Sequence, residues 1–149
     1  MRLVPIWLHV LGVSVWMGGL AWQAHVLAPL ARDGHARLFV EAARRARPVT
    51  WTAVSVIALT GFYNVTRLGS LEQVMTSGAG LALAGKFMLV LAAIALASQR
   101  DFAQVPRLAR AVAAGEDPAP ILRGIAWLDR LVLLLAIVIV YLGLFVSRA

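Results

Sequence analysis

Residues 4–30 read VPIWLHVLGVSVWMGGLAWQAHVLAPL and contain no formally charged side chain. A bilayer core of about 30 Å is crossed by roughly 20 apolar residues at about 1.5 Å rise per residue, and this run is longer than that. It carries a histidine near each end, His9 and His25. We therefore expect one membrane-spanning helix with two embedded imidazoles, around which the other helices are arranged.

The polar residues of this helix are unevenly spread around its axis. At about 100° per residue, His9 and His25 lie on nearly opposite faces, so they are not expected to serve one site. A polar group in hydrocarbon is costly without a partner, so the stripe that contains His9 should face other helices rather than lipid. That stripe consists of His9, Gly12, Trp16, Gly19 and Gln23.

The composition is that of an integral membrane protein. Of 149 residues, 61% are hydrophobic and only 14% are charged, and the mean hydropathy is +0.82. Cysteine is absent, which excludes disulfides, thiolate metal centres and a cysteine-based copper relay. The net charge of +7 comes mostly from arginines between apolar runs, which favours anionic lipid headgroups over nucleic acid as a partner.

Three further apolar runs, residues 49–66, 79–98 and 126–146, are long enough to cross a bilayer. The amino-terminal run is about twice as long as the apolar region of a signal peptide, so we interpret it as a retained helix. Together the four runs predict an all-α fold. Residues 1–149 should form one domain, an integral membrane, antiparallel four-helix bundle.

Arginine content predicts the orientation of the bundle. Arginines are concentrated in segments 31–48 and 99–125, and positive residues stay on the cytoplasmic side, so both termini should be extracytoplasmic. The segment 32–48 is expected to form a short interfacial helix whose Leu38, Phe39 and Val40 enter lipid. Pro118 and Pro120 should start the last helix at or before Ile121.

Lys86, the only lysine, lies inside the third apolar run. Counted from the outer ends of their helices, His9 and Lys86 lie at similar depth, roughly 10 Å below the outer surface at about 1.5 Å per residue. An ionisable side chain inside a membrane is by default a functional-site hypothesis. The alternatives are that Lys86 reaches up to the interface and that His9 only hydrogen-bonds within the bundle.

Other side chains are candidates for these sites. Trp16, on the same stripe as His9, and Asn64 and Tyr141, in the outer layer, are candidate cofactor-binding residues. Asn64 could instead join two helices, and Tyr141 could be an interfacial anchor. His25 is a second candidate metal ligand, with interfacial placement as its alternative. A second cluster nearer the cytoplasmic side would contain Gln23, His25, Trp51, Asp129 and Arg130.

Hydrolase motifs are absent from the sequence. There is no HExxH, no phosphate-binding glycine loop and no Ser-His-acid set in reach of a pocket, and enzymatic activity of another kind is left open. Met17 lies roughly 80° from His9 around its helix and Met88 nearly opposite Lys86, so neither clearly joins the outer site, which disfavours a thioether relay for Cu(I).

Three stretches resemble the bacterial copper-resistance D (CopD) family: LHVLGVSVWMGGL, LTGFYNVTRLGS and GLALAGKFMLVLAAIAL. The resemblance covers roughly residues 5–105 and depends on the spacing of His9, Trp16, Gly18, Gly19, Gly61 and Lys86. It implies a domain of the bacterial inner membrane that moves or handles copper.

His9 and Lys86 also resemble the first-helix histidine and third-helix lysine of the small HemJ-type protoporphyrinogen oxidases, which are tied to haem b. Neutral imidazole suits copper or haem iron equally. A lysine ammonium repels a bare cation, so it must lose its proton to ligate a metal, or it could hold a haem propionate. The cofactor prediction is therefore copper or haem b.

Three functions follow from these residues. Copper handling at an outer-leaflet site of His9 and Lys86 is the first, a haem b redox protein the second, and a structural or assembly subunit the third. A copper carrier or redox protein is expected as partner on the outer side. Small surface residues such as Ser14 and Gly18 favour a homodimer.

Overall fold

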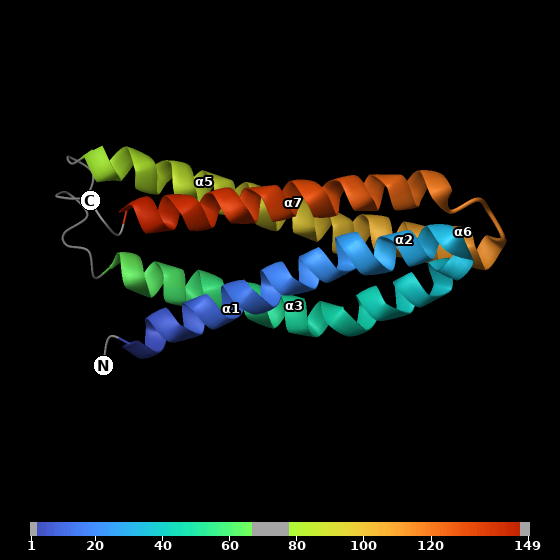
Figure 1. Cartoon of the computed structure of the whole chain (residues 1–149), viewed down its shortest axis with the longest axis horizontal. Helices are drawn as coiled ribbons and strands as arrows, with labels where there is room; N and C mark the ends of the chain where they lie inside the picture. The colour runs from blue at the N-terminus through green and yellow to red at the C-terminus, as the bar shows by residue number, and fades with distance from the viewer. Residues whose placement is uncertain (1–2, 67–77, 147–149) are drawn as a thin grey trace.

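The computed structural model describes residues 3–66 and 78–146, and this part of the chain is helical apart from short turns. The helices α1 (Leu3–Trp22), α3 (Ala36–Val65), α5 (Gly78–Gln99) and α7 (Ala119–Val146) lie side by side along the long axis of the molecule (Figure 1). Leu3, Val65, Gly78 and Val146 all lie at one end of this bundle, which we call the open end.

The chain reverses at the opposite end, which we call the reversal end (Figure 1). α1 continues through the π-helical turn η1 (Gln23–Leu27), the short α2 (Ala28–Leu30) and η2 (Ala31–His35). α5 continues through η3 (Arg100–Gln104) into α6 (Val105–Ala114). The run from Gly78 to Ala114 is therefore about 55 Å long, well beyond the ~30 Å of a bilayer core.

Glycine allows both reversals. Gly34 has φ +98° and Gly115 has φ +71°, in the left-handed region that other residues rarely adopt. Gly115 ends α6 in a Schellman motif, in which the Glu116 N–H donates to the Ala111 carbonyl over 2.9 Å. α7 then begins at Ala119, within the limit predicted from the prolines.

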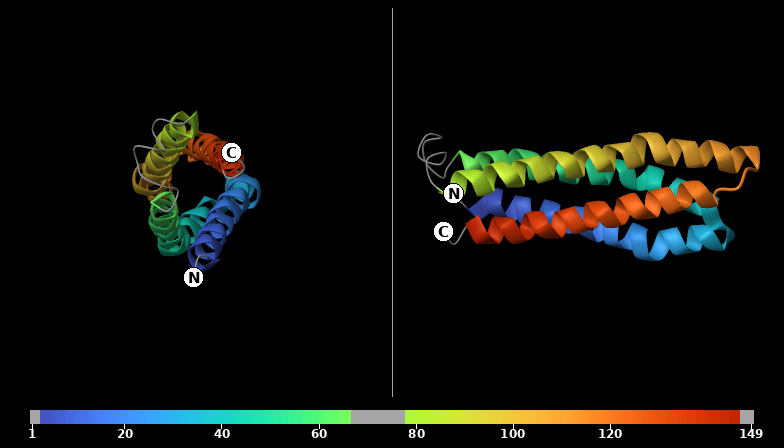
Figure 2. Two further views of the ribbon diagram at one scale, coloured as in Figure 1. Left: turned by 90° about the vertical axis from the view of Figure 1, so that its left-hand side faces the viewer. Right: turned by 90° about the horizontal axis from the view of Figure 1, so that it is seen from above.

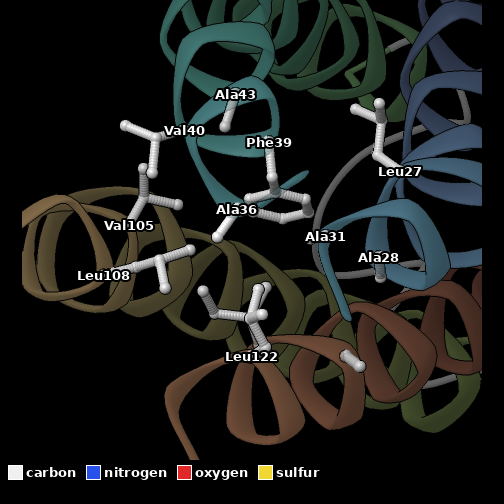
Figure 3. Close-up of a cluster of buried hydrophobic side chains, with 12 residues drawn as sticks. Leu27, Ala28, Ala31, Ala36, Phe39, Val40, Ala43, Val105, Leu108 and Leu122 are labelled. Atoms are coloured by element: carbon white, nitrogen blue, oxygen red, sulfur yellow. The ribbon is translucent and has the colours of Figure 1, made fainter. Parts of the chain in front are cut away.

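The prediction of a separate interfacial helix in segment 32–48 is wrong. α3 begins at Ala36 and continues through Pro48 to Val65. Phe39 and Val40 were expected in lipid but are 1% and 8% exposed, packed against the other helical runs (Figure 3). The physical reason is that α2, α6 and the start of α7 also extend to this level and cover that face of α3.

Two hydrophobic cores lie along the bundle axis. The reversal-end core is built around Phe39, Leu108, Leu122 and Ile125 (Figure 3). The central core has Trp16 and Leu20 against small side chains, which let the helices approach closely. Those small residues are Ala53, Ala93, Ala97 and Ala136.

The outward faces of the bundle are strongly apolar. Trp7, Leu59 and Leu81 are 62%, 73% and 83% exposed. Three helical runs of the described residues are long and apolar enough to cross a membrane, namely Leu3–Val65, Leu83–Ala114 and Ala119–Leu144, and the first of them includes the reversal at Gly34. An all-helical protein with such surfaces belongs in lipid, where every backbone polar group is satisfied within the helix.

The left-handed backbone at Gly34 generates a first prediction. Gly34→Ala should lower the free energy of unfolding by ~1 kcal/mol or more, because a Cβ disfavours positive φ by about that amount. Gly124→Ala is the matched control, since Gly124 lies inside α7 with open space around it. Thermal unfolding in detergent should show a lower melting temperature for Gly34→Ala only, and equal melting of the two variants would contradict the assigned reversal.

Candidate functional site

His9 lies on α1 and turns its ring toward α3. Its Nδ1 is 3.1 Å from the Ile57 carbonyl oxygen and 3.0 Å from the Thr60 hydroxyl oxygen. The Thr60 hydroxyl donates its own proton to a backbone carbonyl, and its oxygen lies 2.5 Å from the Val56 carbonyl oxygen. Both neighbours of Nδ1 are therefore acceptors, which places the imidazole proton on Nδ1 and leaves the lone pair on Nε2.

Glycines bring α1 and α3 close enough for this contact. A Cβ at Gly61 would lie 3.2 Å from the Cε1 atom of His9, and a Cβ at Gly12 would lie 3.3 Å from the Ala53 carbonyl oxygen. Both distances are tighter than ordinary carbon contacts. The imidazole is thus held by hydrogen bonds on one edge and by close packing on the same side of the ring.

Lys86 lies on α5 and reaches α7. A Cβ at Gly143 would lie 3.0 Å from its Nζ atom, so the ammonium rests directly over this glycine. The side chain is half-buried, and no hydrogen bond or ion pair joins it to another residue in the ranges 3–66 and 78–146. The charge of Lys86 is therefore held near the open end without a described counter-ion.

His9 and Lys86 lie on two different helices that both pack against α7. α1 packs against α3 and α7, and α5 packs against α7, so α1 and α5 flank α7 (Figure 2). His9 and Lys86 each lie about two helical turns from the open end. Neither residue belongs to a hydrophobic core.

The other candidate residues are placed differently. Trp16 is buried in the central core, and its Nε1 has no hydrogen-bond partner among the described residues. Asn64 is half-buried, and its side chain forms no hydrogen bond within the described part of the chain. Tyr141 is 67% exposed, on a different face of α7 from Gly143. His25 is exposed, and its Nδ1 lies 2.9 Å from the Ala21 carbonyl of its own helix.

Metal-binding side chains do not cluster in the described part of the chain. No group of three His, Cys, Asp or Glu residues there could hold a metal ion. His25 lies about 24 Å along the helix from His9 at ~1.5 Å per residue. His9 would therefore be the single such ligand from these residues at the open end.

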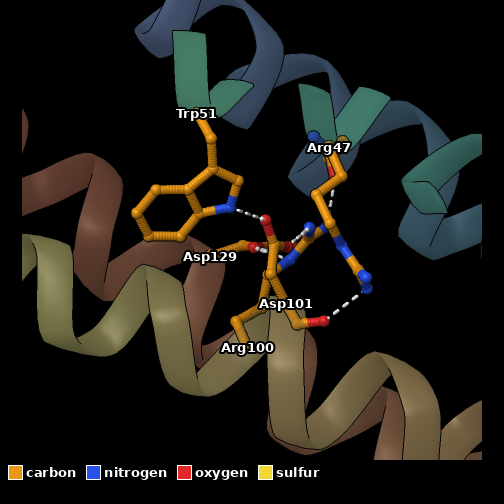
Figure 4. A network of polar contacts seen from close by, with 6 residues as sticks. Arg47, Trp51, Arg100, Asp101 and Asp129 are labelled. Carbon is orange, nitrogen blue, oxygen red and sulfur yellow. Dashed lines mark hydrogen bonds and ion pairs between the residues drawn. The ribbon is translucent and has the colours of Figure 1, made fainter. Parts of the chain in front are cut away.

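A second polar cluster lies between the two hydrophobic cores, and we call it the arginine network (Figure 4). The guanidinium of Arg100 contacts Asp101 Oδ1 at 2.5 Å and Asp129 Oδ1 at 2.9 Å, and donates to the Gln23 side-chain oxygen. All four side chains are buried. Gln23 follows α1, Arg100 and Asp101 follow α5, and Asp129 belongs to α7.

α3 completes the arginine network. The Trp51 indole N–H donates to Asp101 Oδ2 over 3.0 Å, and Arg47 donates to the Asp101 backbone carbonyl over 2.6 Å (Figure 4). The guanidinium of Arg47 also lies 5.0 Å from the ring centroid of Phe102. Arg100 thus faces two buried carboxylates, and the half-buried Arg47 brings a second positive charge to the backbone carbonyl of Asp101.

The sequence predicted part of the arginine network. Gln23, Trp51 and Asp129 come together as expected, whereas His25 and Arg130 are exposed. Arg100 and Asp101 were missed because they lie just beyond the predicted apolar run 79–98. The apolar spacing of Val105, Leu108 and Ala111 was the signal that the helix continues beyond them.

Comparison with known proteins gives one family. A family model described as Copper resistance protein D matches residues 40–146. No curated protein and no solved structure matches the chain. The matched range contains Lys86, Gly143 and the arginine network except Gln23, and it begins after His9.

The arginine network generates a second prediction. Arg100→Ala should destabilise the protein by ~3–5 kcal/mol, because it leaves two buried carboxylates without their cation. Arg100→Lys should restore only part of this loss, since an ammonium cannot match the planar fork of a guanidinium. Melting temperature in detergent measures both effects.

The control for this prediction is Arg107→Ala, which removes an exposed arginine of α6. Its melting temperature should stay close to that of the unsubstituted protein. If Arg100→Ala melts at the same temperature as Arg107→Ala, the arginine network does not hold the bundle together.

Proposed function

This chain belongs to the copper resistance protein D (CopD) family, and from that premise we propose that it binds copper in the outer leaflet of the bacterial inner membrane, with His9 as the protein ligand. The observation that carries the proposal is the hydrogen bonding of His9. Its Nδ1 faces only acceptors, so Nε2 keeps a lone pair for a metal. Copper binds well to neutral imidazole.

The proposed topology has four membrane crossings, by α1, α3, α5 and α7. Each helix is long enough for a ~30 Å core, and the turn at Gly34 separates the first two. Exposed arginines gather at the reversal end, which would make that end cytoplasmic and both termini extracytoplasmic. These are Arg32, Arg37, Arg44, Arg45, Arg107, Arg110 and Arg123.

This topology supports an outer-leaflet site. His9 and Lys86 lie near the open end, which then faces the extracytoplasmic side. The reversal end is closed by a hydrophobic core and by the arginine network. A ligand would reach His9 from the outer side, where we expect a copper carrier to deliver it.

Haem b is the second candidate. A free Nε2 suits haem iron as well as copper, and the unpaired ammonium of Lys86 suits a haem propionate. The two ligands differ in colour. Visible spectra of the detergent-purified protein, oxidised and dithionite-reduced, should lack a Soret band for the copper protein and should show a Soret band with sharp reduced bands for a haem protein.

The copper proposal predicts that His9→Ala loses bound copper. The matched control is His25→Ala, which removes an exposed imidazole of the same helical run and should bind as the unsubstituted protein does. Copper per protein is measured by elemental analysis after dialysis in detergent. Full binding by His9→Ala would exclude this site, and a colourless protein without copper would leave a structural subunit as the function.

The packing of His9 generates a further prediction. Gly61→Ala should weaken copper binding roughly tenfold or more, because the added Cβ pushes the ring away from its hydrogen-bond acceptors. Gly85→Ala is the control, since nothing lies near a Cβ at that position of α5. Both variants should keep a cooperative melting transition. Equal copper affinity of the two variants would show that the position of the His9 ring does not determine copper binding.

A further inference from the structure

The outward surface of the bundle changes character at one level along its axis. From the open end to the arginine network, large apolar side chains are exposed on all four long helices. Val49, Phe102 and Trp127 are still 58%, 56% and 63% exposed, and they lie within about 5 Å of the network along their helices. Of the described residues beyond that level, only Leu30 and Leu38 are large, apolar and exposed.

The length of this apolar surface matches a bilayer. Leu81 and Phe102 are both exposed, and the helical run between them is about 30 Å long, like the hydrocarbon core of a membrane. The indole of Trp127 then lies where a membrane–water interface begins, a position that tryptophan favours. α6, which ends at Ala114, extends about 18 Å beyond Phe102.

Exposed arginines surround the bundle just beyond the apolar surface. One comes from each helical run, and along the helices they lie about 9–13 Å from the arginine network. The runs themselves form a closed ring at this end, because η2 and α6 each pack against both α3 and α7. We call these residues the arginine belt, and they are Arg32, Arg44, Arg107 and Arg123.

The charges of the arginine belt are not neutralised by the described residues. Three members form no hydrogen bond or ion pair there, namely Arg44, Arg107 and Arg123. Arg32 donates only from Nε, to the Ala28 carbonyl over 3.2 Å. Arg45, close to the belt, differs because it pairs with Glu41 over 2.7 Å.

The arrangement of the belt indicates its partner. Guanidinium groups bind phosphate through paired, charge-assisted hydrogen bonds. An acidic protein would contact one side of the bundle, whereas the belt faces all sides at one level. Lipid phosphates surround a membrane protein at a single depth, so a bilayer surface has the geometry that the belt requires.

We infer that the arginine belt binds the headgroup phosphates of anionic phospholipids and so fixes the depth of the bundle, with the reversal end standing outside the lipid. The inference goes beyond copper binding and does not depend on it, since His9 lies toward the opposite end. It requires only that the apolar surface lies in a bilayer.

The test uses the full chain in uncharged detergent. Phosphatidylglycerol or phosphatidylcholine with the same acyl chains is added at rising mole fraction, and native mass spectrometry counts the bound lipids. The unsubstituted protein should bind phosphatidylglycerol about tenfold more tightly, and added salt should reduce this preference. Inorganic phosphate should not displace the lipid, because it lacks acyl chains to lie along the apolar surface.

Two arginines of α3 give a matched pair of variants. Arg44→Gln should weaken phosphatidylglycerol binding about fivefold. Arg37→Gln removes the same charge from nearly the same face of α3, about 10 Å farther from the apolar surface, and should leave the affinity unchanged. Arg107→Gln should reproduce the loss from α6, and it decides the question if Arg44→Gln does not fold.

Three results would overturn the inference. Equal losses in Arg44→Gln and Arg37→Gln would mean that net charge alone attracts the lipid. Equal binding of the two lipids, or displacement by inorganic phosphate, would exclude a belt for anionic phospholipids. If the lipids bind alike while soluble polyglutamate binds and is weakened by Arg44→Gln, the belt serves an acidic protein instead.

Discussion

The structure depends on the ion pairs of Arg100. In lipid, apolar packing discriminates poorly between helix registers, because the lipid tails are as apolar as the side chains. A buried guanidinium must find its carboxylates, and Arg100 does so only when Gln23, Asp101 and Asp129 meet at one level. We therefore attribute the relative positions of the helices mainly to the arginine network, and those positions in turn bring His9 and Lys86 to similar depths.

The two ends of the bundle differ in packing. The reversal end has a dense core and long helices that continue beyond the apolar spans. The open end holds two half-buried polar side chains, each resting on a glycine of a neighbouring helix, and neither belongs to a core. Ligand sites are often built where local packing is least dense, and a rigid opposite end allows this without loss of the fold.

Sequence patterns predicted the features that depend on local chemistry. Apolar run lengths gave an all-helical membrane protein, and the family resemblance agrees with the match over residues 40–146. The error in segment 32–48 arose because an amphipathic, arginine-rich helix has the same sequence pattern whether its apolar face packs against lipid or against other helices. Phe39 shows which occurs, since its burial needs partners that are distant in sequence.

The sequence by itself determined that helices form, that they belong in lipid, and that His9 and Lys86 are ionisable groups inside the apolar runs. Tertiary structure decided what those groups can do. The proton position on His9 follows from Ile57 and Thr60, and the place of the Lys86 ammonium follows from Gly143. Helical periodicity predicts which face of its own helix a side chain occupies. It does not predict which acceptor or which glycine of another helix that side chain meets, because such contacts join segments far apart in the chain.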